Sequence, residues 1–255
     1  TNAQIVNGCQ TTVTLREAFE QGELSDDVKV LVRIYSTDNP NLVDKITLTT
    51  NNQNRITDRD LRENDPVQRD IERIMLDKFG YYYERKNRQH RALRGEKKRK
   101  VIPSPKAAQA YLAIVRGKPS NARGYLAAVW SDFYGEIFQN ASVPDLVLAY
   151  KILSYCQAEA RSSRLQKLDE VELETRVYGS NHVARMVGFE LVKDQWGNSN
   201  IKDIEQILND RNLEALLQSA YAKSVRICLE IRKSHRDDDP IPALYYKNSK
   251  SQKAL

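Results

Sequence analysis

The sequence predicts an α+β fold, in which a small mixed-sheet module at the N-terminus is followed by an all-α helical bundle. Apolar and polar residues alternate between residues 28 and 35, which is the period of a half-buried strand. From residue 106 onward, apolar residues recur instead at helical spacing. Because a strongly basic segment separates the two patterns, we expect an α+β module over 1–84, a basic linker over 85–104, a helical domain over 105–236 and a tail over 237–255.

The first motif is IVNGCQTT, at residues 5–12. Ile5 and Val6 predict the end of a buried strand, and Asn7-Gly8 predicts a tight turn that tolerates a positive φ. We expect Thr11 or Thr12 to cap a helix that carries Val13, Leu15, Ala18 and Phe19. The N–H groups at such a helix start can bind a phosphate, although an ordinary strand-to-helix turn has the same residues.

Two further segments belong to this module. The segment VKVLVRIY predicts a strand, with Lys29 and Arg33 on the face opposite to Val28, Val30, Val32 and Ile34. A row of carboxamides at residues 51–54 then precedes Arg55 and a helix capped by Thr57 or Asp58. Carboxamides offer donors and acceptors that suit bases, ribose or phosphate, whereas the simpler interpretation is a solvated loop with Asx turns.

Glu84-Arg85-Lys86 matches the E-x-K half of a metal-dependent nuclease signature, for which Asp65, Asp70 or Asp77 could supply a second carboxylate. Helical spacing argues against this site. We expect a helix that starts at Asp65-Pro66, stops at Gly80, and carries Val67, Ile71, Ile74, Met75 and Phe79. The aspartates would then lie on a helix and not on paired strands.

Residues 85–100 hold nine Lys or Arg against one Glu, a local charge of +8 in a chain of net charge +6. Tyr81, Tyr82 and Tyr83 stand directly before this run. Cations beside aromatic rings favour nucleic-acid binding, whereas a solvated basic loop behind packed tyrosines is the alternative. The predicted contacts are Tyr83, Arg85, Lys86, Arg88, Arg91, Arg94, Lys97, Lys98, Arg99 and Lys100.

The helical domain is predicted from apolar stripes over 106–117, 122–138, 176–193 and 201–233, with a further helix starting at Pro144. Its aromatic residues are expected in the core, and the charges from Asp169 to Glu174 on a solvated face. The acidic and proline-rich segment 237–242 is expected to end the folded part.

Cysteines 9, 156 and 228 and histidines 90, 182 and 235 are scattered, so we expect neither disulfides nor a metal site. Cys9 is a candidate reactive thiol by its position at a helix start, but we expect it only to replace a polar residue. No apolar run is long enough to span a bilayer and no signal peptide is evident, so we expect a soluble, cytoplasmic protein.

The series IVNGCQT, VLVRI, TNNQN, YYYERK and AAQAYLAI resembles the AIPR family, bacterial proteins associated with abortive infection and phage resistance. The resemblance covers residues 3 to about 138. Cys9 stands where the family usually has Gln. The chain also starts without Met or the Asn-Asn-Gly segment that typically precedes this motif, so we expect a fragment of a longer protein.

The N-terminal motifs are also distantly similar to those of ParB proteins, which bind CTP with a glycine turn and an E-N-x-Q-R box. This similarity implies phosphate contacts at Gly8, Gln10 and Thr11, with Asn51 and Gln53 in the second box. Thr50 and Asn54 stand where that box has Glu and Arg, and Arg55 lies one place late. A Mg²⁺-dependent hydrolase is therefore disfavoured, and a nucleotide is the candidate cofactor.

The resemblance implies a phage-defence protein, and the motifs predict that it binds a nucleotide or nucleic acid. The predicted pocket consists of Asn7, Gly8, Gln10, Thr11, Thr12, Asn51, Asn52, Gln53 and Arg55. The alternatives are a Mg²⁺-dependent nuclease that uses Glu84 and Lys86, or a protein-interaction scaffold without catalysis. No catalytic residue is assigned, and a homo-oligomer or a defence-system protein is a candidate partner besides nucleic acid.

Overall fold

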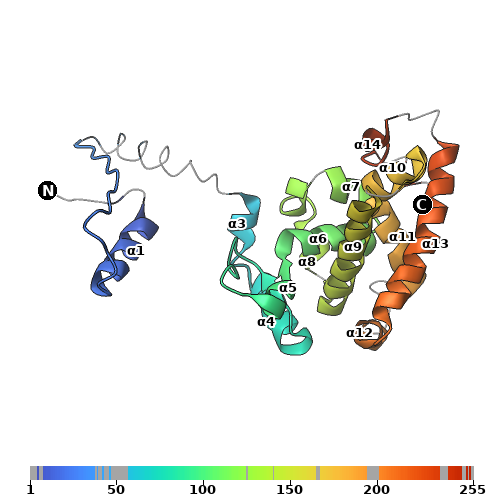
Figure 1. Cartoon of the computed structure of the whole chain (residues 1–255), viewed down its shortest axis with the longest axis horizontal. Helices are drawn as coiled ribbons and strands as arrows, with labels where there is room; N and C mark the ends of the chain where they lie inside the picture. The colour runs from blue at the N-terminus through green and yellow to red at the C-terminus, as the bar shows by residue number, and fades with distance from the viewer. Residues whose placement is uncertain are drawn as a thin grey trace. The chain divides into compact units, whose positions relative to one another are not determined.

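The computed structural model describes residues 8–37, 57–124, 126–139, 141–164, 167–193, 201–235 and 241–248, together with Ile5, Asn39, Leu42, Ile46, Ser251 and Lys253 (Figure 1). The chain divides into two compact units, Thr1–Thr57 and Asp58–Leu255. The structure therefore groups residues 58–84 with the helices that follow them. The described part is mostly helical, with one small sheet, which agrees with the α+β class at that coarse level.

In the first unit, helix α1 (Cys9–Glu20) starts where a helix was predicted, although its cap differs. Gly8 is the N-cap, with a left-handed φ of 94°, and its carbonyl accepts the Thr12 amide at 2.9 Å. The predicted threonine cap was wrong, because Thr11 and Thr12 lie inside the first turn. There the Thr12 hydroxyl donates back to the carbonyl of Gly8 at 3.1 Å.

The predicted strand at residues 28–35 was wrong: the segment has no regular secondary structure. Leu31 and Ile34 are 85% and 87% exposed. Alternation produces a strand only when a neighbouring strand pairs with it and a second layer covers its apolar face. Within the described part of this unit no strand does so, and the mixed ParB-like sheet is not seen there.

The second unit begins with α3 (Asp58–Arg62) and α4 (Pro66–Phe79). Helix α4 confirms the prediction at both ends, because Pro66 opens it and Gly80 closes it with a left-handed φ of 66°. Its buried face contains Ile71 and Met75, together with the amide side chain of Gln68. The candidate nuclease aspartates Asp70 and Asp77 therefore lie on a helix, as the spacing predicted.

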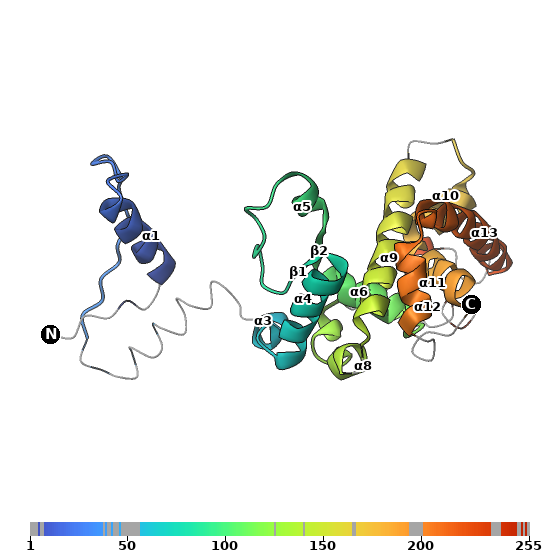
Figure 2. The same ribbon diagram turned by 90° about the horizontal axis from the view of Figure 1, so that it is seen from below.

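Strand β1 (Tyr82–Glu84) pairs in parallel with β2 (Val101–Pro103), and Tyr83 stands opposite Ile102. Both of these side chains are fully buried. Parallel strands cannot be joined by a tight turn, so residues 85–100 form a long connection that contains the short helix α5 (Gly95–Arg99). We call this connection the basic crossover. Figure 2 shows it extending away from the β1–β2 pair as an open loop.

The core of the second unit is built on α6 (Ser104–Ile114) and α9 (Val143–Ser163), which pack against each other. Pro144 opens α9 as predicted, and the Ser142 hydroxyl caps it by accepting the amide of Asp145 at 3.2 Å. Helices α10 (Glu170–Tyr178) and α11 (Ser180–Val192) then pack against α9. The predicted helical bundle is therefore present in the described residues.

Three predicted helical stripes are broken in the structure, and one of them is 176–193, which contains the end of α10 at Tyr178 and the start of α11 at Ser180. Residues 122–138 form the end of α7 (Pro119–Gly124), the 3₁₀ turn η1 (Leu126–Val129) and α8 (Tyr134–Phe138). This folding back stacks Trp130 on Phe138, with ring centroids 5.4 Å apart. Residues 201–233 form α12 (Ile201–Asn209) and α13 (Leu213–Ser234), separated by a turn in which Asp210 accepts the amide of Asn212.

The predicted tail also contains packed residues. Helix α14 (Pro242–Tyr245) buries Tyr245, and Tyr246 after it is buried as well. The Tyr246 hydroxyl donates to Thr175 Oγ1 of α10 at 3.2 Å. The folded part thus extends beyond residue 237. Searching the described helices for a membrane span finds none of sufficient length and apolarity.

Candidate functional site

The basic crossover divides into an anchored base and an exposed outer part. At the base, Arg85 Nε lies 3.0 Å from Glu72 Oε2, and its Nη1 donates to both the carbonyl of Glu63 and Asn64 Oδ1. Lys86 Nζ lies 3.6 Å from Glu63 Oε1. Arg59 adds two bonds to the backbone carbonyls of residues 84 and 85. These contacts fix the departure of the crossover from β1, so Arg85 and Lys86 are held by the protein.

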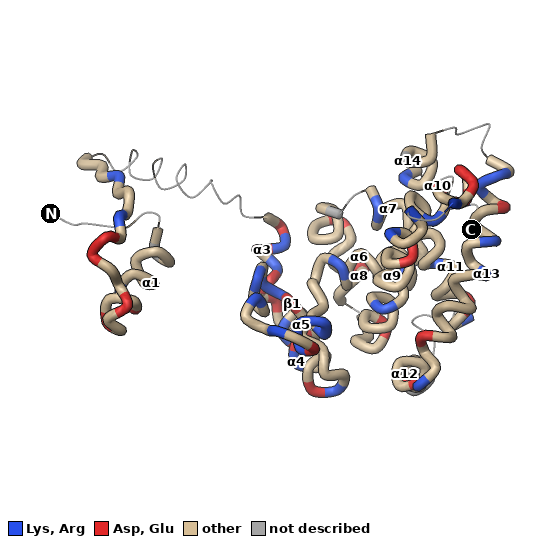
Figure 3. Tube along the Cα trace, viewed as in Figure 1, with Lys and Arg blue, Asp and Glu red and all other residues tan. Residues whose placement is uncertain are grey.

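The outer part carries cations with no acidic partner in the portion of the chain that the structure describes. All of them are exposed: Arg88, Arg91, Arg94, Lys97, Lys98, Arg99 and Lys100. Within the described residues, Arg94 bonds to the backbone carbonyls of Arg91 and Leu93 and to no carboxylate. Figure 3 shows the Lys and Arg residues gathered along α5 and the adjoining trace. These seven side chains are therefore available to contact a polyanion.

Tyr83 was predicted to contact nucleic acid, but the structure places it in the core with no exposed surface. Its hydroxyl donates to Gln68 Oε1 at 2.8 Å, and burial raises the pKa of Tyr83 well above its usual range. Gln68 in turn donates to Tyr134, whose hydroxyl donates to Asp65 Oδ2 at 2.8 Å. Tyr83 is thus an anchor of β1, and its ring cannot stack on a base in this conformation.

The other two tyrosines are half-buried beside the crossover. The Tyr82 ring meets the His90 ring edge to face, with centroids 5.5 Å apart. His90 also contacts the carbonyl of Tyr83 at 3.3 Å, which ties the start of the crossover to the sheet. Lys151 Nζ lies over the Tyr81 ring at 5.4 Å. Of the three rings, Tyr82 is the one that lies against the crossover.

The predicted N-terminal pocket is described only on one side. Gly8 has the positive φ that the Asn-Gly turn predicted, and Gln10, Thr11 and Thr12 are exposed on the first turn of α1. Its remaining members lie outside the described residues: Asn7, Asn51, Asn52, Gln53 and Arg55. That these two clusters form one pocket stays a prediction.

The residues of the nuclease alternative bond to other side chains or lie apart from one another. Asp65 accepts from Tyr134, Asp70 pairs with Arg73, and Lys86 pairs with Glu63. Across the described positions, no three His, Cys, Asp or Glu side chains are grouped as a metal site. Glu84 is half-buried in β1, where its carbonyl accepts from Arg59.

His182 belongs to a buried cluster that its isolated position in the sequence did not reveal. Its Nε2 lies 3.2 Å from Ser120 Oγ and 3.0 Å from Ser251 Oγ. Both hydroxyls can donate to the carbonyl of Asn248, so the geometry favours Nε2–H as the donor to them. Burial, and then the charge of Arg123, lower the pKa of His182 to about 3. The cluster is uncharged and holds the C-terminal segment in place through hydrogen bonds. It has no exposed nucleophile.

A sequence model of the AIPR protein family matches residues 1–235 of the chain, which is most of its length. Neither a curated protein nor a solved structure matches it. The match includes the turn at Gly8, the basic crossover and the helices up to α13, so the family is defined over both compact units. The chain belongs to the AIPR family, and this membership supports a role in abortive infection and phage resistance.

Proposed function

We propose that this AIPR protein binds nucleic acid through the outer part of the basic crossover. The observation that carries the proposal is the group of seven exposed cations, none paired with an acid among the described residues, on a loop whose base is fixed. Such cations bind phosphates and release the counterions that surround a nucleic acid. Recognition of invading nucleic acid is the use that a phage-defence protein would make of this surface.

The arrangement supports binding that depends little on sequence. Lysine and arginine side chains on a loop and a short exposed helix contact phosphates, which carry no sequence information. The edge-to-face pair of Tyr82 and His90 at the base of the crossover offers one stacking surface for an unpaired base. We therefore expect single strands to bind at least as tightly as duplexes of equal length.

The test compares two variants that lose the same charge. In the first, Lys97, Lys98, Arg99 and Lys100 are all changed to Gln. In the control, four exposed cations elsewhere are changed to Gln: Arg69, Lys78, Arg211 and Arg226. Binding of labelled single- and double-stranded oligonucleotides is measured by fluorescence anisotropy across a range of salt concentrations.

We expect the crossover variant to lose affinity and to flatten the plot of log K against log salt by up to about 0.9 per duplex phosphate contact removed. The control variant should retain both the affinity and the slope. Equal weakening in the two variants would show only a general effect of net charge. No weakening in the crossover variant would refute the proposal.

A second candidate is a phosphate-bearing nucleotide at the start of α1. The specific observation is that Gly8 adopts a left-handed conformation directly before a helix whose first turn exposes Gln10, Thr11 and Thr12. In this proposal the phosphate accepts hydrogen bonds from the turn. The rest of the ligand contacts Asn51, Asn52, Gln53 and Arg55.

Thermal-shift titration with the four ribonucleotides, with and without Mg²⁺, tests this candidate. Stabilisation by at least one nucleotide should disappear in Gly8→Val, because a β-branched residue cannot adopt φ of 94° without strain. If no nucleotide stabilises the wild-type chain, the pocket is refuted. Mg²⁺-dependent cleavage that is lost in Glu84→Ala would instead support the nuclease alternative.

A further inference from the structure

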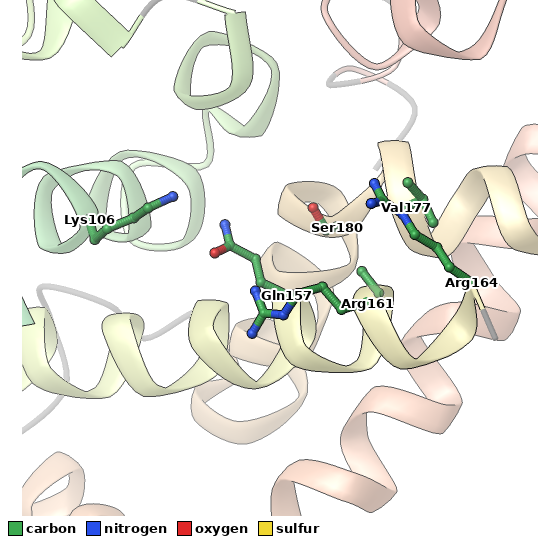
Figure 4. A pocket seen from close by; sticks show the side chains of 7 residues that line it. Lys106, Gln157, Arg161, Arg164, Val177 and Ser180 are labelled. Atoms are coloured by element: carbon green, nitrogen blue, oxygen red, sulfur yellow. The ribbon is translucent and has the colours of Figure 1, made fainter. Parts of the chain in front are cut away.

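A cavity of about 230 Å³ lies where α6, α9, the end of α10 and the start of α11 meet, and the charged side chains that line it are cationic (Figure 4). Lys106 enters it from α6, and Arg161 and Arg164 enter it from the C-terminal end of α9. Gln157 and Ser180 supply the uncharged polar groups, and an alanine and a valine complete the lining. Among the described residues, no carboxylate lines the cavity.

The charges around this cavity are not balanced locally. Lys106 Nζ donates to the neutral Gln109 Oε1 at 3.2 Å. Burial lowers the pKa of Lys106, and the charge of Arg161 lowers it further, so the charge that acts most on this lysine is positive. Neither Arg161 nor Arg164 forms an ion pair with any described residue, and both side chains are exposed to solvent, as is that of Lys106. An anion placed between the three would relieve their mutual repulsion.

The floor of the cavity adds hydrogen-bond donors. Ser180 is only 8% exposed, and its hydroxyl makes no hydrogen bond to the rest of the described chain. It is also the first residue of α11, a helix of 13 residues whose N-terminus has no side-chain cap. The first amides of a helix lack intrahelical partners and carry a partial positive charge. The unpartnered hydroxyl of a mostly buried serine and a helix start therefore face the same space as three cations.

We propose that this cavity binds the terminal phosphate of a small phosphorylated ligand. Arg161 and Arg164 hold the phosphate oxygens from one side, Lys106 from another, and Ser180 donates from the floor. The volume is below the roughly 300 to 1,000 Å³ of pockets that enclose whole ligands, so the phosphate enters and the remainder of the ligand stays outside. A phosphate monoester of this kind is present both in free nucleotides and at the 5′ end of a nucleic-acid strand.

The test uses the full chain at constant ionic strength. Inorganic phosphate, a nucleoside 5′-monophosphate and the corresponding nucleoside are titrated separately, with binding followed by calorimetry and by thermal shift. A 5′-phosphorylated oligonucleotide is compared with its 5′-hydroxyl form to distinguish the two sources. We expect phosphate and the monophosphate to bind saturably and the nucleoside to show no binding.

Matched variants then locate the site. Arg161→Gln combined with Arg164→Gln should weaken phosphate binding by about tenfold or more, because charge-assisted hydrogen bonds are lost. The control combines Arg211→Gln with Arg226→Gln, two exposed cations of the same net charge elsewhere in the unit, and should bind as the wild type does. Ser180→Ala should weaken binding by a smaller factor.

Arg161 and Arg164 also lie near the C-terminus of α9, where cations stabilise a helix, so each variant is first melted without ligand. Equal weakening by the two double variants, or no saturable phosphate binding by the wild type, would overturn the proposal. The crossover variant, designed above to weaken nucleic-acid binding, should keep its affinity for phosphate at the cavity. That result would show that the cavity binds phosphate independently of the proposed function.

Discussion

Arg85 Nε lies 3.0 Å from Glu72 Oε2, and only 11% and 26% of the two side chains are exposed. Arg85 belongs to the most basic segment of the chain, and it forms an ion pair with a residue of α4. Lys86 pairs with Glu63, and the other seven cations of the crossover, from Arg88 to Lys100, have no acidic partner among the described residues. The segment therefore combines a structural residue with the surface that we propose for nucleic-acid binding, and mutations can separate the two roles.

Arg85→Gln should lower the free energy of unfolding by about 1 to 3 kcal/mol, since it removes charge-assisted hydrogen bonds at a partly buried site. Lys97→Gln, at an exposed position in the same crossover, should change it by less than about 0.5 kcal/mol. Urea denaturation measures both. Equal stabilities would mean that the ion pair with Glu72 contributes nothing.

Tyr83→Phe should destabilise the protein by about 1 to 3 kcal/mol, because Gln68 Oε1 is left in the core without its donor. Tyr82→Phe removes a hydroxyl from the neighbouring, half-buried position and is the matched control. Thermal melting compares them. A Tyr83→Phe variant that melts with the control would show that another donor reaches Gln68.

His182 should make stability depend on pH. Its folded pKa is lowered to about 3, below the unfolded value of 6.5, so the unfolded state binds more protons between these values. The stability is fully present above about pH 6.5 and is lost as the pH falls toward 3. Between pH 7 and pH 5 this group should account for a loss of about 2 kcal/mol.

The check is urea denaturation of wild type and His182→Gln at pH 7 and at pH 5. Other groups titrate equally in both proteins, so the difference between their pH effects isolates the histidine. The variant should lose about 2 kcal/mol less than the wild type on acidification. An identical loss in both proteins would mean that His182 is already solvated in the native state.

Gly179→Ala should destabilise the corner between α10 and α11 by about 1 to 3 kcal/mol through overpacking. A Cβ atom there would lie 2.5 Å from the carbonyl oxygen of Thr175 and 2.8 Å from the Tyr246 ring. Gly124→Ala is the control, because its nearest neighbour would be a Lys247 carbon at 3.8 Å. Calorimetry of the two variants should give clearly different melting temperatures, and equal values would show that both the Thr175 carbonyl and the Tyr246 ring shift at little cost.

Local signals predicted some elements correctly and failed where contacts beyond a single helical turn decide. Helix α4 was predicted at both ends, because a proline at its start and a glycine after it act within one turn. The stripe over 122–138 was read as one helix, yet the chain folds back there so that Trp130 can stack on Phe138. Such a contact cannot be predicted from the spacing of apolar residues alone.

The sequence by itself determined the family, the helical character of the second unit, the turn conformation at Gly8 and the concentration of charge in the crossover. The tertiary structure alone decided which of those charges are free, because pairing depends on acids such as Glu72 that lie on another helix. It also decided the grouping of Lys106, Arg161 and Ser180, which lie far apart in the chain. Composition and spacing are local properties, whereas burial and ion pairing depend on which surfaces meet when the helices pack.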